Sequence, residues 1–438
     1  MSKLKNRLNR LKKTHASSDI NEKDQVTSSQ PSEVEEWGGV GAVTETTSYG
    51  SFIKRLIKIP FHKKVGFYPL SQLVDKAEVL CHLQASESNI QHDKMLFFDT
   101  ETTGLGIGTG NVPFMLGIGY YTKEEFVVEQ LFIRNPSEEL AMLTYMNEKF
   151  QQFTHLVSYN GKTFDLPLLK NRFVLHRKTY EGEHLEHLDL LYPARSLWRN
   201  TLTTCKLSYV EHQRLGIHRV DDVPGSMAPT LYFKYLSEKD PNIMADVFRH
   251  NEIDIVTLAV LSIYFTTLFE DTELYKSIEL DELYRLCLWF NKMELTDQFQ
   301  QVYELLIKRA TEEDPNYFIP LAMIFKKKKE VETSVFLWRE FIELQGHQRM
   351  INTEPYIELA KYYEHRKKDF EKAIYYTKEA EQRVYQRISF SRRDNKYVET
   401  IKEIQKRKTR LERKWMNKQE KREKMDDVSH PKQIQINI

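Results

Sequence analysis

The sequence has few cysteines, almost no net charge and no long apolar run, and each absence excludes a class of protein. Its three cysteines, Cys81, Cys205 and Cys287, form no CxxC pair, which argues against structural zinc and a disulfide framework. The 64 Lys and Arg balance the 63 Asp and Glu, so no overall basic field indicates nucleic-acid binding. No apolar run approaches the roughly 20 residues that cross a bilayer, and no apolar segment follows the basic N-terminus as in a secretory signal. We therefore expect a cytoplasmic protein that does not use a membrane.

The chain of 438 residues is long enough for two or three domains. Residues 1–50 join a basic start to a Ser/Glu/Thr-rich stretch with few apolar side chains, so we predict a disordered tail. Its basic start is compatible with a nucleic-acid arm or with a solvated tail. Residues 51–90 are predicted to be a lead-in of short helices, with helical spacing from Leu73 to Leu83.

The clearest chemical signal is a pair of acids at the end of an apolar strand. Asp99 and Glu101 follow the apolar run Met95 to Phe98 at positions i and i+2, and side chains two apart on a strand point to one face. Carboxylates crowded in this way repel each other unless a divalent cation neutralises them. Hard oxygen ligands of this kind suit Mg²⁺ or Mn²⁺.

Two later segments extend this pattern. After the predicted strand His155 to Tyr159 and an Asn160-Gly161 turn, Asp165 opens a helix; Asp254 lies inside an apolar helix, with His250 four residues earlier on the same helical face. The four acids predict a site for two metal ions about 4 Å apart that activates a water and stabilises the leaving oxygen in phosphodiester cleavage.

The elements around these acids predict a mixed α/β sheet in residues 91–272. Three successive strands are followed by alternating helices and strands. The expected strands are 95–99, 113–121, 125–134, 155–159 and 187–191, and the expected helices are 137–153 and 164–176.

These motifs resemble those of a known nuclease family. The Asp-x-Glu-Thr-Thr-Gly sequence at 99–104 is similar to the first motif of the DEDD (DnaQ-like) 3′–5′ exonucleases of the RNase H-like superfamily, and Tyr-Asn-Gly-x-x-Phe-Asp at 159–165 is similar to their second motif. The whole layout resembles that of the YprB-type proteins of bacilli, which include a mitomycin repair factor. The resemblance covers about residues 90–270 by motif and the rest by architecture. It implies an RNase H-like fold, with Asp99, Glu101, Asp165 and Asp254 as the metal-binding acids.

His250 departs from that family pattern in its spacing. One DEDD subtype places a catalytic His five residues before the last Asp, where this chain has Arg249, and the other places a Tyr four before, where this chain has His250. A neutral histidine takes a proton from an attacking water near pH 7. We predict His250 to be the general base.

Substrate contacts are expected on both sides of the acids. The glycines at 104, 106, 108 and 110 are followed by no Lys-Ser/Thr and open no helix, so a phosphate-binding P-loop is not supported. By resemblance, Thr102, Thr103 and Leu105 contact the 3′-terminal nucleotide. Asn160 either orients substrate or caps its turn, and Lys162 either meets a phosphate or lies on a solvated face. Arg195 and Arg199, after the last strand, are further candidate phosphate contacts.

The region 275–400 is predicted to be an all-α domain of tetratricopeptide-like (TPR-like) repeats. Leu286, Leu321 and Leu359 each begin a similar Leu-x-x-x-aromatic segment, at spacings of 35 and 38 residues, close to the TPR period of about 34. Stacked helical hairpins of this type present a surface to a protein partner. Residues 401–438 are predicted to be a basic helix and tail, either a solvated cap or a surface for DNA or a partner.

The preferred hypothesis is a two-metal 3′–5′ exonuclease acting on DNA, with DNA favoured over RNA through the resemblance to a repair factor. The same resemblance implies a role in DNA repair, an association with the bacterial nucleoid during action, and a helicase as a candidate TPR partner. The alternatives are a ribonuclease or structure-selective nuclease on the same fold, and a TPR scaffold that binds nucleic acid without cleaving it.

Overall fold

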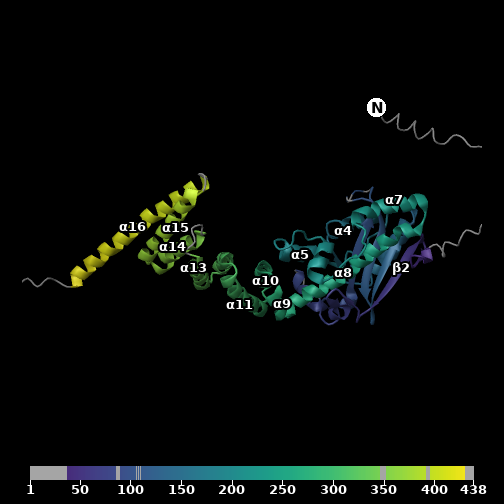
Figure 1. The fold of residues 1–438 in the computed structure, drawn as a ribbon, viewed down its shortest axis with the longest axis horizontal. Coiled ribbons are helices and arrows are strands. Elements are labelled where there is room, and N and C mark those ends of the chain that lie inside the picture. The colour runs from purple at the N-terminus through teal and green to yellow at the C-terminus, as the bar shows by residue number, and fades with distance from the viewer. Residues whose placement is uncertain are drawn as a thin grey trace, which may run out of the picture.

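A seven-stranded mixed sheet and a succession of helices form the structure, a computed structural model (Figure 1). It describes residues 37–84, 89–104, 106, 108, 110–345, 352–390 and 395–429. The sheet has the order β1-β2-β7-β6-β5-β8-β9. Its strands are β1 (Ala42–Thr47), β2 (Gly50–Pro60), β5 (Met95–Thr102), β6 (Pro113–Tyr121), β7 (Glu125–Phe132), β8 (His155–Ser158) and β9 (Glu186–Asp189). A separate hairpin pairs β3 (Lys64–Val65) with β4 (Tyr68–Pro69).

Strand β5 is the centre of the sheet and joins its antiparallel and parallel parts. It pairs antiparallel with β6, which pairs antiparallel with β7, and it pairs parallel with β8, which pairs parallel with β9. The predicted mixed sheet is confirmed. Because the carboxyl ends of β5, β8 and β9 lie at one edge, residues that follow these strands are brought together there.

The N-terminal part of the sheet differs from the sequence prediction. Residues 42–47, placed in the tail, form edge strand β1, and residues 50–60, predicted as short helices, form β2, which pairs with both β1 and β7. The predicted helical spacing at 73–83 corresponds to two 3₁₀ helices, η1 (Leu70–Leu73) and η2 (Ala77–Leu83). Alternating charges in β2 weakened its strand signal, and pairing with two neighbours decides its conformation. Residues 1–36 lie outside the described residues.

Helices cover the two faces of the sheet. On one face pack α3 (Glu139–Phe150), α4 (Asp165–Leu175) and α7 (Ala228–Glu238), and on the other pack α5 (Leu191–Trp198) and most of α8 (Ala245–Glu270). The short α6 (Leu207–Val210) lies between α5 and α7 in the chain. Along β5, Leu96 and Phe98 belong to the core of the first face, whereas Met95 and Phe97 belong to that of the second. By this alternation Asp99 and Glu101 lie on the α8 side.

Helix α8 is the central helix of the fold. The stretch Pro241–Glu270 is apolar and long enough to cross a membrane by composition, which corrects the expectation that no such run exists, but 78% of its most apolar window is buried inside the protein. A close approach to the sheet is possible because β6 has two glycines below α8. A Cβ on Gly117 would lie 2.2 Å from Asn251 Oδ1, and one on Gly119 would lie 2.5 Å from Ile255 Cγ2.

Helical hairpins continue the chain beyond α8 (Figure 1). After α9 (Thr272–Ser277), the pairs are α10 (Leu280–Lys292) with α11 (Thr296–Glu312), α12 (Phe318–Lys327) with α13 (Val331–Gln345), and α14 (Glu354–Tyr362) with α15 (Phe370–Phe390). The three segments with the predicted repeat pattern lie in α10, α12 and α14. The helical character of this region is confirmed, and its TPR-like nature stays a prediction.

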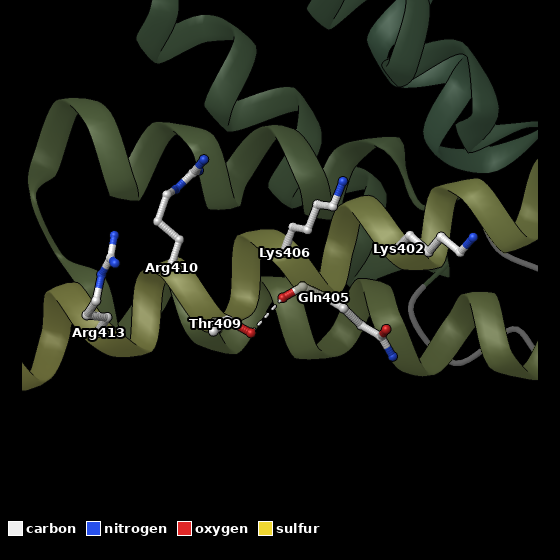
Figure 2. A pocket seen from close by; sticks show the side chains of 6 residues that line it. All are labelled: Lys402, Gln405, Lys406, Thr409, Arg410 and Arg413. Carbon is white, nitrogen blue, oxygen red and sulfur yellow. Dashed lines mark hydrogen bonds between the residues drawn. The ribbon is translucent and has the colours of Figure 1, made fainter.

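The chain's basic helix is α16 (Asn395–Ser429), which packs along α15 through Ile404 and Leu411. Figure 2 shows Lys402, Lys406, Arg410 and Arg413 along α16. Part of its positive charge is used inside the protein, because Arg407, Arg410 and Lys414 all contact the buried carboxylate of Glu364. Its role, as a solvated cap or as a surface for DNA or a partner, stays a prediction.

Candidate metal centre

Three separate segments bring the four predicted acids to one edge of the sheet. Asp99 and Glu101 lie near the end of β5, Asp165 is the first residue of α4 after β8, and Asp254 lies three residues after Asn251 on α8. Glu101 and Asp165 are buried, and Asp254 is only 15% exposed. The carboxylates therefore share an environment with little water to screen their charges.

The crowding of these acids alters their proton affinity. Burial raises the pKa of Asp99 well above its usual value, and the charges of Asp254, Asp165 and Glu101 raise it further. Burial likewise raises the pKa of Glu101, with contributions from Asp254 and Asp165. The pKa of Asp165 is raised by burial to about 6, although a hydrogen bond from Thr100 opposes this shift. Without a cation, the cluster favours bound protons over full ionisation.

Part of this cluster has the geometry of a metal site. One ligand atom each from Glu101, His250 and Asp254 lie within 4.8 Å of one another. The two carboxylates are donors that Mg²⁺ or Mn²⁺ accepts, and the imidazole lies within reach of the same position. The raised pKa values of the neighbouring acids give an independent reason for a cation here, because a positive charge would offset their mutual repulsion. The residues present therefore fit a divalent metal.

Asp99 is held in place by an amide relay from α8 and β7. Asn251 donates from Nδ2 to Asp99 Oδ2 at 3.0 Å, and Gln130 donates from Nε2 to Asn251 Oδ1 at 2.9 Å. Arg55 on β2 donates to Gln130 Oε1 at 2.8 Å. Asn251 and Gln130 are fully buried, so the relay fixes the carboxylate by satisfied hydrogen bonds. None of these three residues was predicted from the sequence.

His250 is oriented by a carboxylate on the loop before α7. Its Nδ1 lies 2.9 Å from Asp222 Oδ1, and its Nε2 lies 3.5 Å from Asp254 Oδ2. The two Asp222 oxygens, 2.9 and 3.0 Å from Nδ1, favour a ring proton there over the longer 3.2 Å contact with the Arg219 guanidinium, and this leaves Nε2 able to accept a proton. Burial opposes a low pKa for Asp222, but the hydrogen bond with His250 and the charge of Arg219 lower it overall. Gly225 on the same loop leaves space over the ring, because a Cβ there would lie 3.2 Å from Nε2.

Arg219 is a further residue of the site that the sequence did not indicate. Its guanidinium forms ion pairs with Asp254, with Asp222 at 3.0 Å and with the fully buried Glu211 at 2.6 Å. It supplies a positive charge within the acidic cluster.

The residues beside β5 that were predicted to contact substrate form hydrogen bonds with the local backbone. Thr102 donates from Oγ1 to Gly104 O at 2.7 Å, and Thr103 Oγ1 accepts from Val112 N at 3.0 Å. Both hydroxyls thus stabilise the loop after β5. Leu105 lies outside the described residues.

The second predicted group lies around the β8–α4 turn. Asn160 adopts a positive φ of 71° and its Oδ1 accepts a hydrogen bond from Thr163 at 2.9 Å, as expected of a turn residue. Asp189, at the end of β9, accepts from the backbone N–H groups of Asn160 and Lys162 at 2.7 and 3.0 Å. The side chain of Lys162 is exposed. Asp189 therefore anchors the turn that leads into Asp165.

Comparison with known proteins agrees with this geometry. Residues 96–266 match the RNase H superfamily profile, so the sheet and its acidic edge belong to an RNase H-like domain. The chain is also 33% identical to the uncharacterized protein YprB of Bacillus subtilis (strain 168) over 384 residues, which cover 85% of this chain and 91% of YprB. The protein therefore belongs to the YprB family.

A solved structure is also similar, at a lower level. The family B DNA polymerase from the hyperthermophilic archaeon Pyrobaculum calidifontis matches with 14% identity and a TM-score of 0.34, over 48% of this chain and 30% of the polymerase. This similarity is too low to carry a functional argument. The superfamily match alone fits a role in cleaving nucleic acid.

Proposed function

We propose that this protein is a metal-dependent 3′–5′ exonuclease that hydrolyses phosphodiester bonds of DNA in a repair process. The observation that carries the proposal is the convergence of Asp99, Glu101, Asp165 and Asp254 at one sheet edge, with raised pKa values in three of them. Charge repulsion on this scale is costly in a purely structural site. The RNase H superfamily match supports a nuclease of this general class.

Each group of the site has a role in the proposed mechanism. Two divalent ions, when bound, would activate a water and stabilise the leaving oxygen. The four carboxylates would hold them through oxygen ligands. His250 would accept the proton of the attacking water at Nε2, and Asp222 would stabilise the protonated ring through Nδ1–H. Arg219 would balance charge when the carboxylates ionise.

The helical region would add a second function. The hairpins α10/α11, α12/α13 and α14/α15 support a TPR-like module that binds a protein partner. This proposal is independent of the nuclease activity. A partner captured by residues 275–400 in both the native and the Asp99→Ala protein would separate the two functions.

The nuclease proposal is tested with oligonucleotides labelled at either end. DNA and RNA, single- and double-stranded, are incubated with the full-length protein in Mg²⁺, Mn²⁺ or EDTA. Asp99→Ala and Asp254→Ala are run in parallel, and Asp93→Ala, at an exposed acid before β5, is the matched control. We expect metal-dependent shortening from the 3′ end of DNA that is absent in the first two variants and intact in the control.

The other outcomes are equally informative. If RNA is degraded faster than DNA, the substrate is RNA. If the cuts are internal, at branched or looped sites, the protein is a structure-selective nuclease and not an exonuclease. Absence of cleavage in any metal, with nucleic-acid binding intact, would contradict the enzyme proposal.

A further inference from the structure

The exposed face of α5 carries positive charge, an aromatic ring and no acid. Tyr192, Arg195 and Arg199 lie at i, i+3 and i+7, hence on one side of the helix and its C-terminal residue. Tyr192 is 50% exposed, and both arginines are exposed. The opposite side packs into the core through Ala194, Leu197 and Trp198. Packing in the core therefore accounts for the apolar residues of α5 but gives no role to the charged and aromatic residues on its exposed face.

The two arginines are available for a ligand. Neither Arg195 nor Arg199 forms an ion pair within the described part of the chain. Arg285, on the neighbouring α10, is different: it is only 9% exposed and pairs with Asp281. The positive charge on this surface thus comes from α5 itself.

This face connects the metal centre to the helical region. One groove of about 410 Å³ is lined by Lys162, Asp189 and Tyr192, among others, and a second of about 330 Å³ is lined by Tyr192, Arg195 and Arg199 together with Trp289 of α10. Tyr192 lines both grooves. Asp189 and Lys162 both line the first groove, and Asp189 holds the backbone turn that leads into Asp165, so this groove begins at that turn. In Figure 1, α5 lies on the side of the sheet domain that faces the helical hairpins.

We propose that these grooves bind a single-stranded stretch of nucleic acid upstream of the terminus that is cleaved, a proposal that rests on the proposed nuclease function. Arginines four residues apart are separated by about 6 Å along a helix axis, which is close to one phosphate step of an extended strand. The Tyr192 ring offers a stacking surface for an unpaired base, which a base inside a duplex cannot use. In the first groove Lys162 offers a cation to a phosphate, and the other charged residues that line it are Glu186 and Asp189.

The test compares a long substrate with one too short to reach α5. The long substrate is a single-stranded 20-mer, and the short one is the p-nitrophenyl ester of thymidine 5′-monophosphate, a chromogenic phosphodiester. The variants are Tyr192→Ala and the double variant Arg195→Gln/Arg199→Gln. The control is Lys94→Gln/Lys123→Gln, which removes two exposed charges at the opposite edge of the sheet, near the start of β5 and in the β6–β7 turn.

We expect each α5 variant to raise KM for the 20-mer about tenfold and to leave kcat/KM for the short ester within twofold of the native value. In the double arginine variant the slope of log KM against log[salt] should fall by about 1.4, roughly 0.7 for each lost phosphate contact on a single strand. The control should change neither quantity. Unchanged KM and salt slope in both α5 variants would overturn the proposal, and an equal loss on blunt duplex would overturn its single-strand assignment.

A binding arm separates this proposal from the nuclease proposal. Fluorescence anisotropy of the labelled 20-mer in EDTA reports affinity without cleavage. If the native protein cleaves neither substrate but binds the 20-mer, and the α5 variants lose about tenfold in affinity, the nuclease proposal fails and the binding site stands. If the variants bind as tightly as the native protein, the binding site fails whatever the cleavage assay gives.

Discussion

At the scale of single residues, the fold holds several carboxylates too close together for full ionisation. Burial and mutual repulsion raise the pKa values of Asp99, Glu101 and Asp165. A folded-state pKa above the unfolded one means that protonation favours the folded protein. The resulting stability is complete below about pH 4, the unfolded pKa, and is lost as the pH rises through about 6 for Asp165 and through the raised pKa values of Asp99 and Glu101.

The upward direction of these pKa shifts gives a first prediction. In EDTA the melting temperature should fall between pH 5 and pH 8, and Mn²⁺ should restore more stability at pH 8 than at pH 5, since the cation replaces the protons. Asp99→Asn should raise the metal-free melting temperature at pH 8 by about 1 °C, equivalent to roughly 1 kcal/mol for a chain of this length, and weaken the Mn²⁺ response. Differential scanning fluorimetry measures both effects. A metal response that is equal at the two pH values would contradict this account.

His250 gives a second prediction about a single side chain. His250→Ala should lower kcat by about 10²–10³-fold, the usual scale of general base catalysis, with a small effect on KM. His250→Tyr should retain more activity than His250→Ala if the four-residue spacing to Asp254 sets the role of this position. Steady-state kinetics on the labelled 20-mer distinguishes these cases. Equal activity of His250→Ala and the native protein would remove His250 from the mechanism.

Asp222 provides the matching positioning test. Asp222→Asn keeps the shape of the side chain but cannot stabilise a protonated His250, so we expect a loss of about tenfold or more in kcat. The effect should be much smaller in a His250→Ala background, because the two residues act together. Additive losses in the double variant would show that Asp222 acts elsewhere.

At the scale of elements, the site depends on how closely α8 approaches β6. Gly117 pairs with Asp99 across the sheet, and its missing side chain makes room for Asn251, which holds Asp99. Gly117→Ala would place a Cβ 2.2 Å from Asn251 Oδ1. We expect a destabilisation of about 1–3 kcal/mol, the usual cost of overpacking, together with lower activity.

A second substitution should restore the stability that Gly117→Ala loses. Gly117→Ala with Asn251→Ala should recover stability in urea unfolding, because the clash is removed, but not activity, because Asp99 loses its hydrogen bond. Gly38→Ala, where a Cβ would meet nothing within 4 Å, is the control. Recovery of both stability and activity in the double variant would contradict the role given to Asn251.

The same element shows how far the sequence alone leads. The i, i+2 acids on an apolar strand predicted β5, and the order of strands and helices after it predicted the mixed sheet, because these signals are local. Strand β2 was missed because its mixture of charged and apolar side chains forms a strand only when it pairs with both β1 and β7. Arg219, Asn251 and Gln130 were missed because their roles come from tertiary contacts across more than 30 residues of chain, which no local pattern encodes.

At the scale of the whole molecule, the sheet domain and the helical region are joined by buried polar contacts. Glu282 of α10 is only 1% exposed and binds Arg214 and, at 2.9 Å, Thr201 of the sheet domain. Trp289 donates to Ser196 of α5 at 2.6 Å. The grooves along α5 therefore end at a fixed junction between the two parts of the chain.

Breaking this junction should destabilise the protein as a unit. Glu282→Ala leaves the Arg214 charge without its buried partner, and we expect a loss of about 3–5 kcal/mol. Lys276→Ala, which removes the exposed pair with Glu273, should cost less than about 1 kcal/mol. Urea unfolding followed by tryptophan fluorescence measures both. Equal, small effects would show that the two parts are not coupled through Glu282.

Direct counting of bound Mn²⁺ tests whether the four carboxylates form a metal centre, without any assumption about substrate. Electron paramagnetic resonance of free Mn²⁺, titrated with the native protein at pH 7.5, gives the number of ions bound. The account predicts two ions per chain, with loss of binding in Asp99→Asn and Asp254→Asn and no change in the Asp93→Ala control. Absence of Mn²⁺ binding at millimolar concentrations, or binding that persists unchanged in both acid variants, would contradict it.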